Sequence, residues 1–308
     1  MKNRLKIILT GLDNAGKTSI LIALEKKYNF ESEILNLKPT IKINYHKTLF
    51  LNKECIFWDM GGQEKYRNFY LRKRYMYFLE TDLLIYIFDI QDKSRFNESL
   101  TYLNMILRYF LKNKLYIPII IAFHKYDPDL ESHADVNKNV SFLTNAIKGK
   151  YPMFNVTFQQ TSIYDIVSIV QLISSGLSNF DRGFLELSMI FEVFLKEVEC
   201  SSLKLFDANG IIVTEANPEP LSMMQYNNLL KNTRENLILL KKTQEDSKKF
   251  SFDSHISGKD LLNYIFKMKV KDPLFYVSAI IKKQDSDEFV NQVSPFLEKI
   301  TGILEKLL

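Results

Sequence analysis

The sequence predicts an α/β fold in which a mostly parallel sheet carries helices on both faces. Strands alternate with helical stretches through residue 180, and this alternation is typical of successive βαβ units. The run from Asp82 to Asp89 is apolar between its two acidic ends, as expected of a central parallel strand that is buried on both faces. After this strand, Ser94 is expected to cap a helix that reaches about Asn113.

The first strand, Leu5 to Thr10, leads into a complete G-x-x-x-x-G-K-[ST] pattern at residues 11–18, which we call the phosphate-binding loop. A helical stretch, Ser19 to Tyr28, follows. The glycines allow a tight turn whose N–H groups point at phosphate oxygens beside a helix N-terminus. A chance glycine-rich turn is the alternative, which the strand–helix context disfavours. The residues expected to contact the phosphates are Asp13, Asn14, Ala15, Gly16, Lys17, Thr18 and Ser19.

A second group of polar residues follows the strand from Glu54 to Trp58. Asp59 is expected to hold a Mg²⁺ ion together with the hydroxyls of Thr18 and of Thr40, which follows Pro39. The N–H of Gly62 is expected to meet a γ-phosphate, and Gln63 to orient an attacking water. Gln63 and Lys17, which reaches the β- and γ-phosphates, are therefore the predicted catalytic residues.

The third group of polar residues predicts which base is bound. The strand from Ile117 to Phe123 ends in His124, Lys125, Tyr126 and Asp127. A carboxylate at Asp127 can accept hydrogen bonds from both N1–H and the 2-amino group of guanine, a donor pair that adenine lacks. Ser162 and Ile163, after the strand from Asn155 to Gln160, are expected to contact the guanine O6 through their backbone.

Five elements occur in this order, each at a strand end: residues 11–18, 39–40, 59–63, 124–127 and 161–163. Together they resemble the Ras-like small GTPases. The segments at residues 11–19 and 58–64 look Arf-like. Those at residues 85–89, 124–127 and 161–165 are similar to the Rag/Gtr family, as is the long C-terminal extension. The resemblance implies a Ras-like G domain with a six-stranded sheet, which uses GTP or GDP with Mg²⁺ and hydrolyses GTP.

Three departures from the common pattern affect this expectation. His124 replaces the usual Asn, so an amide that bridges base and loop is lost, although an imidazole can still donate one hydrogen bond. Asp13 stands where many relatives have Gly, but an Asp at this position is normal in the Arf group. No Arg lies between Ile34 and Thr40 to act as a finger in cis, so intrinsic hydrolysis is expected to be slow without an activating protein.

The segment from Tyr66 to Tyr77, which follows Gln63, combines basic and aromatic residues. It would be the second switch, a docking surface that differs between the two nucleotide states. A solvated basic helix face is the alternative.

A second domain is expected from residue 181 to residue 308, because the βαβ pattern breaks near residue 180 and the basic excess of residues 1–180 gives way to a slight acidic excess. The expected order is α-β-β-α-β-β-β-α, with a hairpin at Asn209 and Gly210 and a long helix from Pro220 to about Asp246. This order resembles the roadblock/longin-type domains of Rag/Gtr proteins. The resemblance implies a homodimer, or a heterodimer with a related GTPase, and roadblock-type scaffold proteins as partners.

Composition limits the remaining possibilities. The chain has 308 residues and a net charge of +5, but no basic stripe with interleaved aromatic residues, so nucleic-acid binding is not expected. Two cysteines without a paired spacing argue against a disulfide scaffold and suit a reducing cytoplasm. The start of the sequence carries no signal peptide, and Lys2 replaces the glycine that myristoylation needs. We expect a cytoplasmic protein that reaches membranes only through partners.

The sequence is compatible with three functions. The leading expectation is a guanine-nucleotide switch with slow GTPase activity that acts as a dimeric, Rag/Gtr-like signalling scaffold with an exchange factor and an activating protein. The alternative is an Arf-like monomeric GTPase in membrane trafficking. A third is a structural subunit that binds nucleotide without hydrolysing it, which Gln63 and Thr40 disfavour because both serve the triphosphate state.

Overall fold

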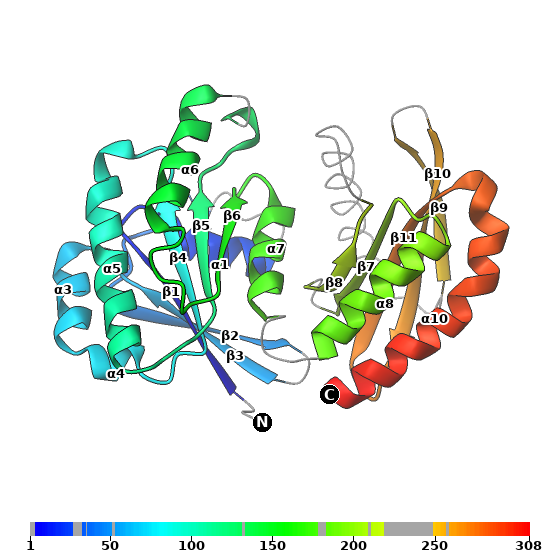
Figure 1. Cartoon of the computed structure of the whole chain (residues 1–308), viewed down its shortest axis with the longest axis horizontal. Coiled ribbons are helices and arrows are strands. Elements are labelled where there is room, and N and C mark those ends of the chain that lie inside the picture. The colour runs from blue at the N-terminus through cyan, green and yellow to red at the C-terminus, as the bar shows by residue number, and fades with distance from the viewer. Residues whose placement is uncertain are drawn as a thin grey trace. The chain divides into compact units, whose positions relative to one another are not determined.

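A computed structural model describes residues 4–26, 33–34, 36–50, 53–130, 133–177, 183–208, 211–218, 249–256 and 259–308 of the chain. Its contacts group the chain into two compact units, Met1–Leu172 and Ile173–Leu308, each of which is described by itself (Figure 1). The division lies within helix α7 (Ile166–Leu177), earlier than the boundary that we expected near residue 180.

The N-terminal unit contains a six-stranded sheet with the order β2-β3-β1-β4-β5-β6. Only the β2–β3 pair is antiparallel, so the predicted mostly parallel sheet is confirmed. The strands are β1 (Arg4–Gly11), β2 (Ile43–Phe50), β3 (Lys53–Met60), β4 (Leu83–Asp89), β5 (Ile119–His124) and β6 (Val156–Thr161). In β4, every residue from Leu83 to Phe88 is buried, as the apolar run predicts.

Helices cover both faces of this sheet (Figure 1). The bounds of the remaining helices are α1 (Lys17–Lys26), α3 (Glu64–Arg72), α4 (Arg74–Phe78), α5 (Phe96–Lys112) and α6 (Ala134–Ile147), with short 3₁₀ turns η1 (Lys93–Arg95) and η2 (Pro128–Leu130). Helices α3 to α6 share one core cluster with alternate residues of the strands, such as Leu84 and Tyr86. Because successive strand residues face opposite sides, Leu83 and Ile85 lie on the other face. Helix α1 packs against β1 and β3.

Helix α5 does not begin as predicted. The hydroxyl of Ser94 donates to Asp92 Oδ1 at 2.6 Å, residues 93–95 form the 3₁₀ turn η1, and the α-helix starts at Phe96. The serine therefore donates a hydrogen bond within the turn before the helix and does not cap α5.

The C-terminal unit has a separate antiparallel sheet with the order β8-β7-β11-β10-β9. Its elements are α8 (Gly183–Glu197), β7 (Ser202–Asp207), β8 (Ile212–Ala216), β9 (Lys249–Ile256), β10 (Lys259–Lys269), β11 (Leu274–Lys282), the 3₁₀ turn η4 (Lys283–Asp285) and α10 (Ser286–Leu307). Helices α8 and α10 pack together, and the stacked rings of Phe194 and Phe296 have their centroids 3.9 Å apart. The tip of the expected β7–β8 hairpin, Asn209 and Gly210, and the helix expected after Pro220 lie outside the described residues.

This sheet-and-helix unit agrees with the predicted second domain. The assignment of residues 181–308 to the roadblock/longin type remains a prediction. Among the helices that the structure describes, none has both the length and the apolar character that crossing a membrane requires.

Candidate functional site

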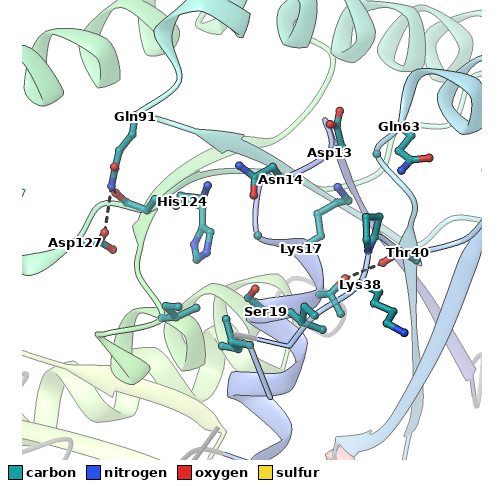
Figure 2. A pocket seen from close by; sticks show the side chains of 18 of the residues that line it. Asp13, Asn14, Lys17, Ser19, Lys38, Thr40, Gln63, Gln91, His124 and Asp127 are labelled. Atoms are coloured by element: carbon teal, nitrogen blue, oxygen red, sulfur yellow. Dashed lines mark hydrogen bonds between the residues drawn. The ribbon is translucent and has the colours of Figure 1, made fainter. Parts of the chain in front are cut away.

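A cleft of about 510 Å³ opens where the loops at the carboxyl ends of the parallel strands meet (Figure 2). Most of the residues predicted for phosphate, metal and base binding line it. They are Asp13, Asn14, Gly16, Lys17, Thr18, Ser19, Thr40, Gly62, Gln63, His124, Lys125, Asp127 and Ile163. Three others lie behind this lining as buried residues, namely Ala15, Asp59 and Ser162.

The phosphate-binding loop keeps its shape because its residues tolerate unusual backbone angles. Gly16 has φ +86°, and Asn14, a type that tolerates the left-handed region, has φ 60°. A Cβ on Gly16 would lie 2.4 Å from the His124 ring, and one on Gly11 would lie 2.4 Å from the Ile87 carbonyl oxygen. The loop ends at α1, whose first N–H groups have no partner within the helix. This is the geometry that suits an anion at a helix N-terminus.

Lys17 provides a buried cation at the base of this loop. It is 5% exposed, and its ammonium donates to the Leu12 carbonyl oxygen at 2.6 Å. Burial lowers the pKa of Lys17 to about 8, against the attraction of Asp59 and Asp13. An anion in the cleft would offset this loss of hydration, because a nearby negative charge favours the protonated amine.

The predicted metal ligands come together although they belong to three separate segments. Thr18 Oγ1 donates to Asp59 Oδ2 at 2.6 Å and lies 2.9 Å from Thr40 Oγ1, while Thr40 Oγ1 donates to the same carboxylate oxygen at 3.2 Å. Asp59 is fully buried, and within the described structure its Oδ1 has no hydrogen-bond partner. Two hydroxyls and a carboxylate with an unpaired buried oxygen fit a hard cation such as Mg²⁺.

This donor set is small, which agrees with Mg²⁺ rather than with a metal held by a full protein cage. In the parts of the chain that the structure describes, no cluster of three or more His, Cys, Asp or Glu side chains could hold a metal ion. Mg²⁺ is commonly held by one or two carboxylates and completes its shell with water and substrate phosphates.

Gly62 and Gln63 place the start of α3 against the phosphate-binding loop. A Cβ on Gly62 would lie 2.3 Å from the Asp13 backbone nitrogen and from the Leu12 carbonyl carbon, so only glycine fits there. Gln63 is the residue before α3, and its side chain makes no capping hydrogen bond. It lines the cleft near Asp13 (Figure 2), where it is available to a water.

His124 replaces the usual amide in an unexpected way. It is 2% exposed, its Nδ1 lies 3.0 Å from Thr161 Oγ1, and its ring packs against Gly16 of the phosphate-binding loop. Burial, with a contribution from the Lys125 charge, lowers the pKa of His124 to about 3. The imidazole is therefore neutral at physiological pH and connects the base side of the cleft to the loop by packing.

The carboxylate of Asp127 is oriented by two donors. Ser162 Oγ donates to Oδ1 at 2.6 Å. Gln91 Nε2 donates to Oδ2 at 3.1 Å (Figure 2), and it also donates to the Lys125 carbonyl oxygen at 2.8 Å. Lys125 itself pairs with Asp89 at 2.6 Å. A carboxylate has about four acceptor positions, so two remain for a base.

Ser162 differs from its predicted role. Its backbone N–H donates to Ser168 Oγ at 3.0 Å, so in this structure it does not point a donor at a base. Its hydroxyl instead orients Asp127. Ile163, which lines the cleft, is left as the candidate for the backbone contact to O6.

Sequence reasoning missed Gln91 and Arg95. Gln91 follows β4 and contacts Asp127, 36 residues later in the chain, while Arg95 pairs with Asp13 across 82 residues. Neither belongs to a local motif. The apolar strand before Gln91 indicated only that this segment lies at the carboxyl edge of the sheet.

The chain is similar to proteins of a known family. Residues 1–167 match the model of the ADP-ribosylation factor family. The chain is 40% identical over 92 residues to ADP-ribosylation factor-like protein 5 of Caenorhabditis elegans, covering 29% of this chain and 46% of that protein. It is 35% identical over 143 residues to ADP-ribosylation factor-like protein 4C of Homo sapiens, covering 44% of this chain and 69% of that protein.

Among solved structures, the Arl6 BBS3 small GTPase from Trypanosoma brucei with the bound nucleotide analogue GppNp is similar. The match has 17% sequence identity and a TM-score of 0.42, and it covers 57% of this chain and 96% of that one.

Proposed function

The chain belongs to the ADP-ribosylation factor family of small GTPases, and from this premise we propose that it is a guanine-nucleotide switch that hydrolyses GTP slowly. One observation carries the proposal. A single cleft combines the buried cation Lys17, the Thr18–Thr40–Asp59 cluster and the oriented carboxylate of Asp127. Lys17 suits the phosphates, the Thr18–Thr40–Asp59 cluster suits Mg²⁺, and Asp127 suits a guanine base.

Each residue has a distinct task in this proposal. Lys17 neutralises phosphate charge, and its burial makes the interaction stronger than it would be in water. Thr18, Thr40 and Asp59 would hold Mg²⁺, which when bound neutralises charge on the phosphate oxygens. Gln63 orients the attacking water.

Hydrolysis should be slow because the arginines that the structure describes beside the phosphate-binding loop, Arg67 and Arg95, are already paired. Arg95 reaches the phosphate-binding loop, but its guanidinium is held by Asp13 at 2.7 Å. An activating protein that supplies a further positive charge would accelerate the reaction, and an exchange factor would release the product GDP.

The family match favours the Arf-like alternative over the Rag/Gtr-like expectation, because the family model and both relatives are ADP-ribosylation factor proteins. A role in membrane trafficking, like that expected of an Arf-like switch, is part of our proposal, whereas the monomeric state of that alternative is not. Neither Cys55 nor Cys200 forms a disulfide, which supports a cytoplasmic location, with membranes reached through partners.

The C-terminal unit lies outside the family match, and we propose that it pairs with a second copy or with a related GTPase. The support is its separate sheet, in which β8 and β9 are the outermost of the strands that the structure describes, since sheet edges are common sites of pairing between chains. Roadblock-type scaffold proteins would be further partners. Such an interface would bury at least about 1,000 Å².

The test combines ligand identity, turnover and mass on the full chain. The purified protein is unfolded to identify released nucleotide, the affinities for GTP, GDP and ATP are compared, and hydrolysis of GTP is followed in a single turnover. Light scattering then gives the mass. Equal affinity for ATP and GTP would overturn the switch, GTP binding without any hydrolysis would favour the structural subunit, and a monomeric mass would remove the pairing role.

A further inference from the structure

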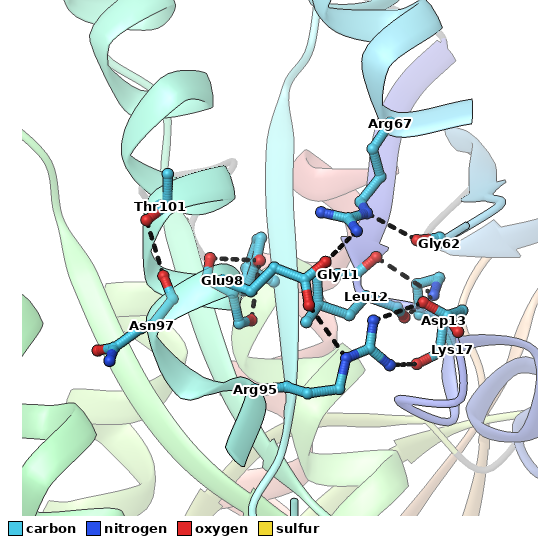
Figure 3. Close-up of polar contacts among 12 residues, drawn as sticks. Gly11, Leu12, Asp13, Lys17, Gly62, Arg67, Arg95, Asn97, Glu98 and Thr101 are labelled. Carbon is cyan, nitrogen blue, oxygen red and sulfur yellow. Dashed lines mark hydrogen bonds and ion pairs between the residues drawn. The ribbon is translucent and has the colours of Figure 1, made fainter. Parts of the chain in front are cut away.

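A line of charged side chains connects the phosphate-binding loop to the start of α3 (Figure 3). It begins at Asp13, whose carboxylate oxygen Oδ1 lies 2.7 Å from Arg95 Nη2 and whose backbone oxygen accepts from Arg95 Nη1 at 3.3 Å. Arg95 thus donates hydrogen bonds to both the side chain and the backbone of Asp13, which lines the cleft.

Glu98, in the first turn of α5, extends this line to α3. Its Oε2 accepts from Arg95 Nε at 3.1 Å, and its Oε1 is bound by Arg67 Nη2. Arg67 Nε in turn donates to the Gly62 carbonyl oxygen at 2.8 Å. We call Arg95, Glu98 and Arg67 the ionic relay.

The relay is more than an exposed ion pair. Arg67 is only 6% exposed, and its guanidinium lies over the Tyr102 ring at 5.4 Å. A cation in this position depends on Glu98, because a buried charge without its partner is costly. Although burial alone would raise the pKa of Glu98, the hydrogen bonds from Arg95 and Arg67 hold that pKa below its usual value.

The two residues that the relay binds at its ends, Asp13 and Gly62, also contact each other. Gly62 approaches Asp13 so closely that a Cβ on Gly62 would lie 2.3 Å from the Asp13 nitrogen. The relay and this contact therefore form a closed ring that fixes Gly62 on the phosphate-binding loop.

We propose that Arg95, Glu98 and Arg67 are positioning residues that hold Gly62 in place for a triphosphate and so set the preference for GTP over GDP. The proposal rests on the function proposed above, in which the Gly62 N–H meets the γ-phosphate. GDP lacks that phosphate, so the relay contributes to GTP binding and is dispensable for GDP binding.

The test compares Glu98→Gln and Arg95→Met with the control Lys93→Met, which removes an exposed cation from the same 3₁₀ turn. Affinities for a non-hydrolysable GTP analogue and for GDP are measured with Mg²⁺. Each relay variant should lower the ratio of GTP-analogue affinity to GDP affinity about tenfold, the size expected for one charge-assisted hydrogen bond, while the control keeps the wild-type ratio.

Two further measurements separate positioning from a general structural role. The double variant should lose less than the product of the single losses, because both residues act in one network. The fluorescence of Trp58, next to Asp59, should change less on exchanging GDP for the GTP analogue than it does in the wild type. Arg95→Met supplies the answer if Glu98→Gln does not fold, since it leaves the Glu98–Arg67 pair in place.

The possible failures are distinguishable. Variants that bind both nucleotides with the wild-type ratio, or that lose GTP and GDP binding equally, would overturn the relay and leave the switch intact. A wild-type chain that binds neither nucleotide would overturn the switch and the relay together.

Discussion

Replacing Asp127 by Asn should change the base that the protein prefers. In the structure the carboxylate accepts one hydrogen bond from Ser162 at 2.6 Å and one from Gln91 at 3.1 Å, which leaves acceptor positions for the two guanine donors. An Asn side chain keeps one acceptor oxygen and presents an NH₂ group in place of the other. The Ser162 hydroxyl can turn to accept from that NH₂, but guanine cannot, because the two groups that it presents to residue 127, N1–H and the 2-amino group, are both donors.

The loss can be estimated from these contacts. GTP would lose at least one charge-assisted hydrogen bond, worth about 1.5–3 kcal/mol, and one of its donors would face another donor, at a cost of about 1–3 kcal/mol. Taking about 3 kcal/mol in total, GTP affinity should fall roughly 150-fold. Xanthine nucleotides carry a carbonyl where guanine has its amino group, so they should gain affinity from the new NH₂.

The assay is a competition of GTP, XTP and ATP against a fluorescent guanine nucleotide. Asp129→Asn is the matched control, because Asp129 is an exposed carboxylate two residues further on, in η2. A GTP affinity within about threefold of wild type in Asp127→Asn would refute the reasoning, as would a loss for GTP without any gain for XTP.

Three further changes test other parts of the site. Gln63→Leu should leave GTP affinity unchanged and slow single-turnover hydrolysis roughly tenfold or more, because it removes the group that orients water; an unchanged rate would exclude that role. Thr18→Asn should weaken binding of the GTP analogue with Mg²⁺ more than binding of GDP, and parallel losses in a titration would contradict the metal assignment. His124 has a pKa of about 3 in the folded chain, well below its ordinary value of 6.5. As the pH falls below 6.5, the unfolded chain therefore binds more protons than the folded chain does. The free energy of unfolding should then drop between pH 7 and pH 5 by up to about 1.4 kcal/mol per pH unit. In denaturant titrations, His124→Gln should reduce that slope and His133→Gln, at an exposed position, should not.

Much of the N-terminal unit could be predicted because its information is local. Each motif follows a strand directly, and the carboxyl ends of parallel strands meet at one edge, so Lys17, Thr18, Asp59 and Asp127 had to lie close together once the sheet was predicted. The apolar run that predicted β4 is buried throughout for the same reason.

What could not be predicted depends on pairings between distant residues. Arg95 and Glu98 look like ordinary charges at a helix start, and their positions depend on how η1 and α5 meet the phosphate-binding loop. The predicted cap at Ser94 is wrong because residues 93–95 form a 3₁₀ turn and the α-helix starts only at Phe96. Gln91 gave no signal at all, because an exposed amide after a strand is common.

His124 shows how a departure from a motif can be accommodated by its surroundings. In the sequence it means the loss of an amide that bridges base and loop. In the structure its ring fills the space that a Cβ on Gly16 would need, and burial keeps the ring uncharged, so no positive charge is added beside the base. The contact between strand β5 and the phosphate-binding loop is therefore kept by shape instead of by an amide hydrogen bond. Base recognition is left to Asp127, which Ser162 and Gln91 orient independently of His124.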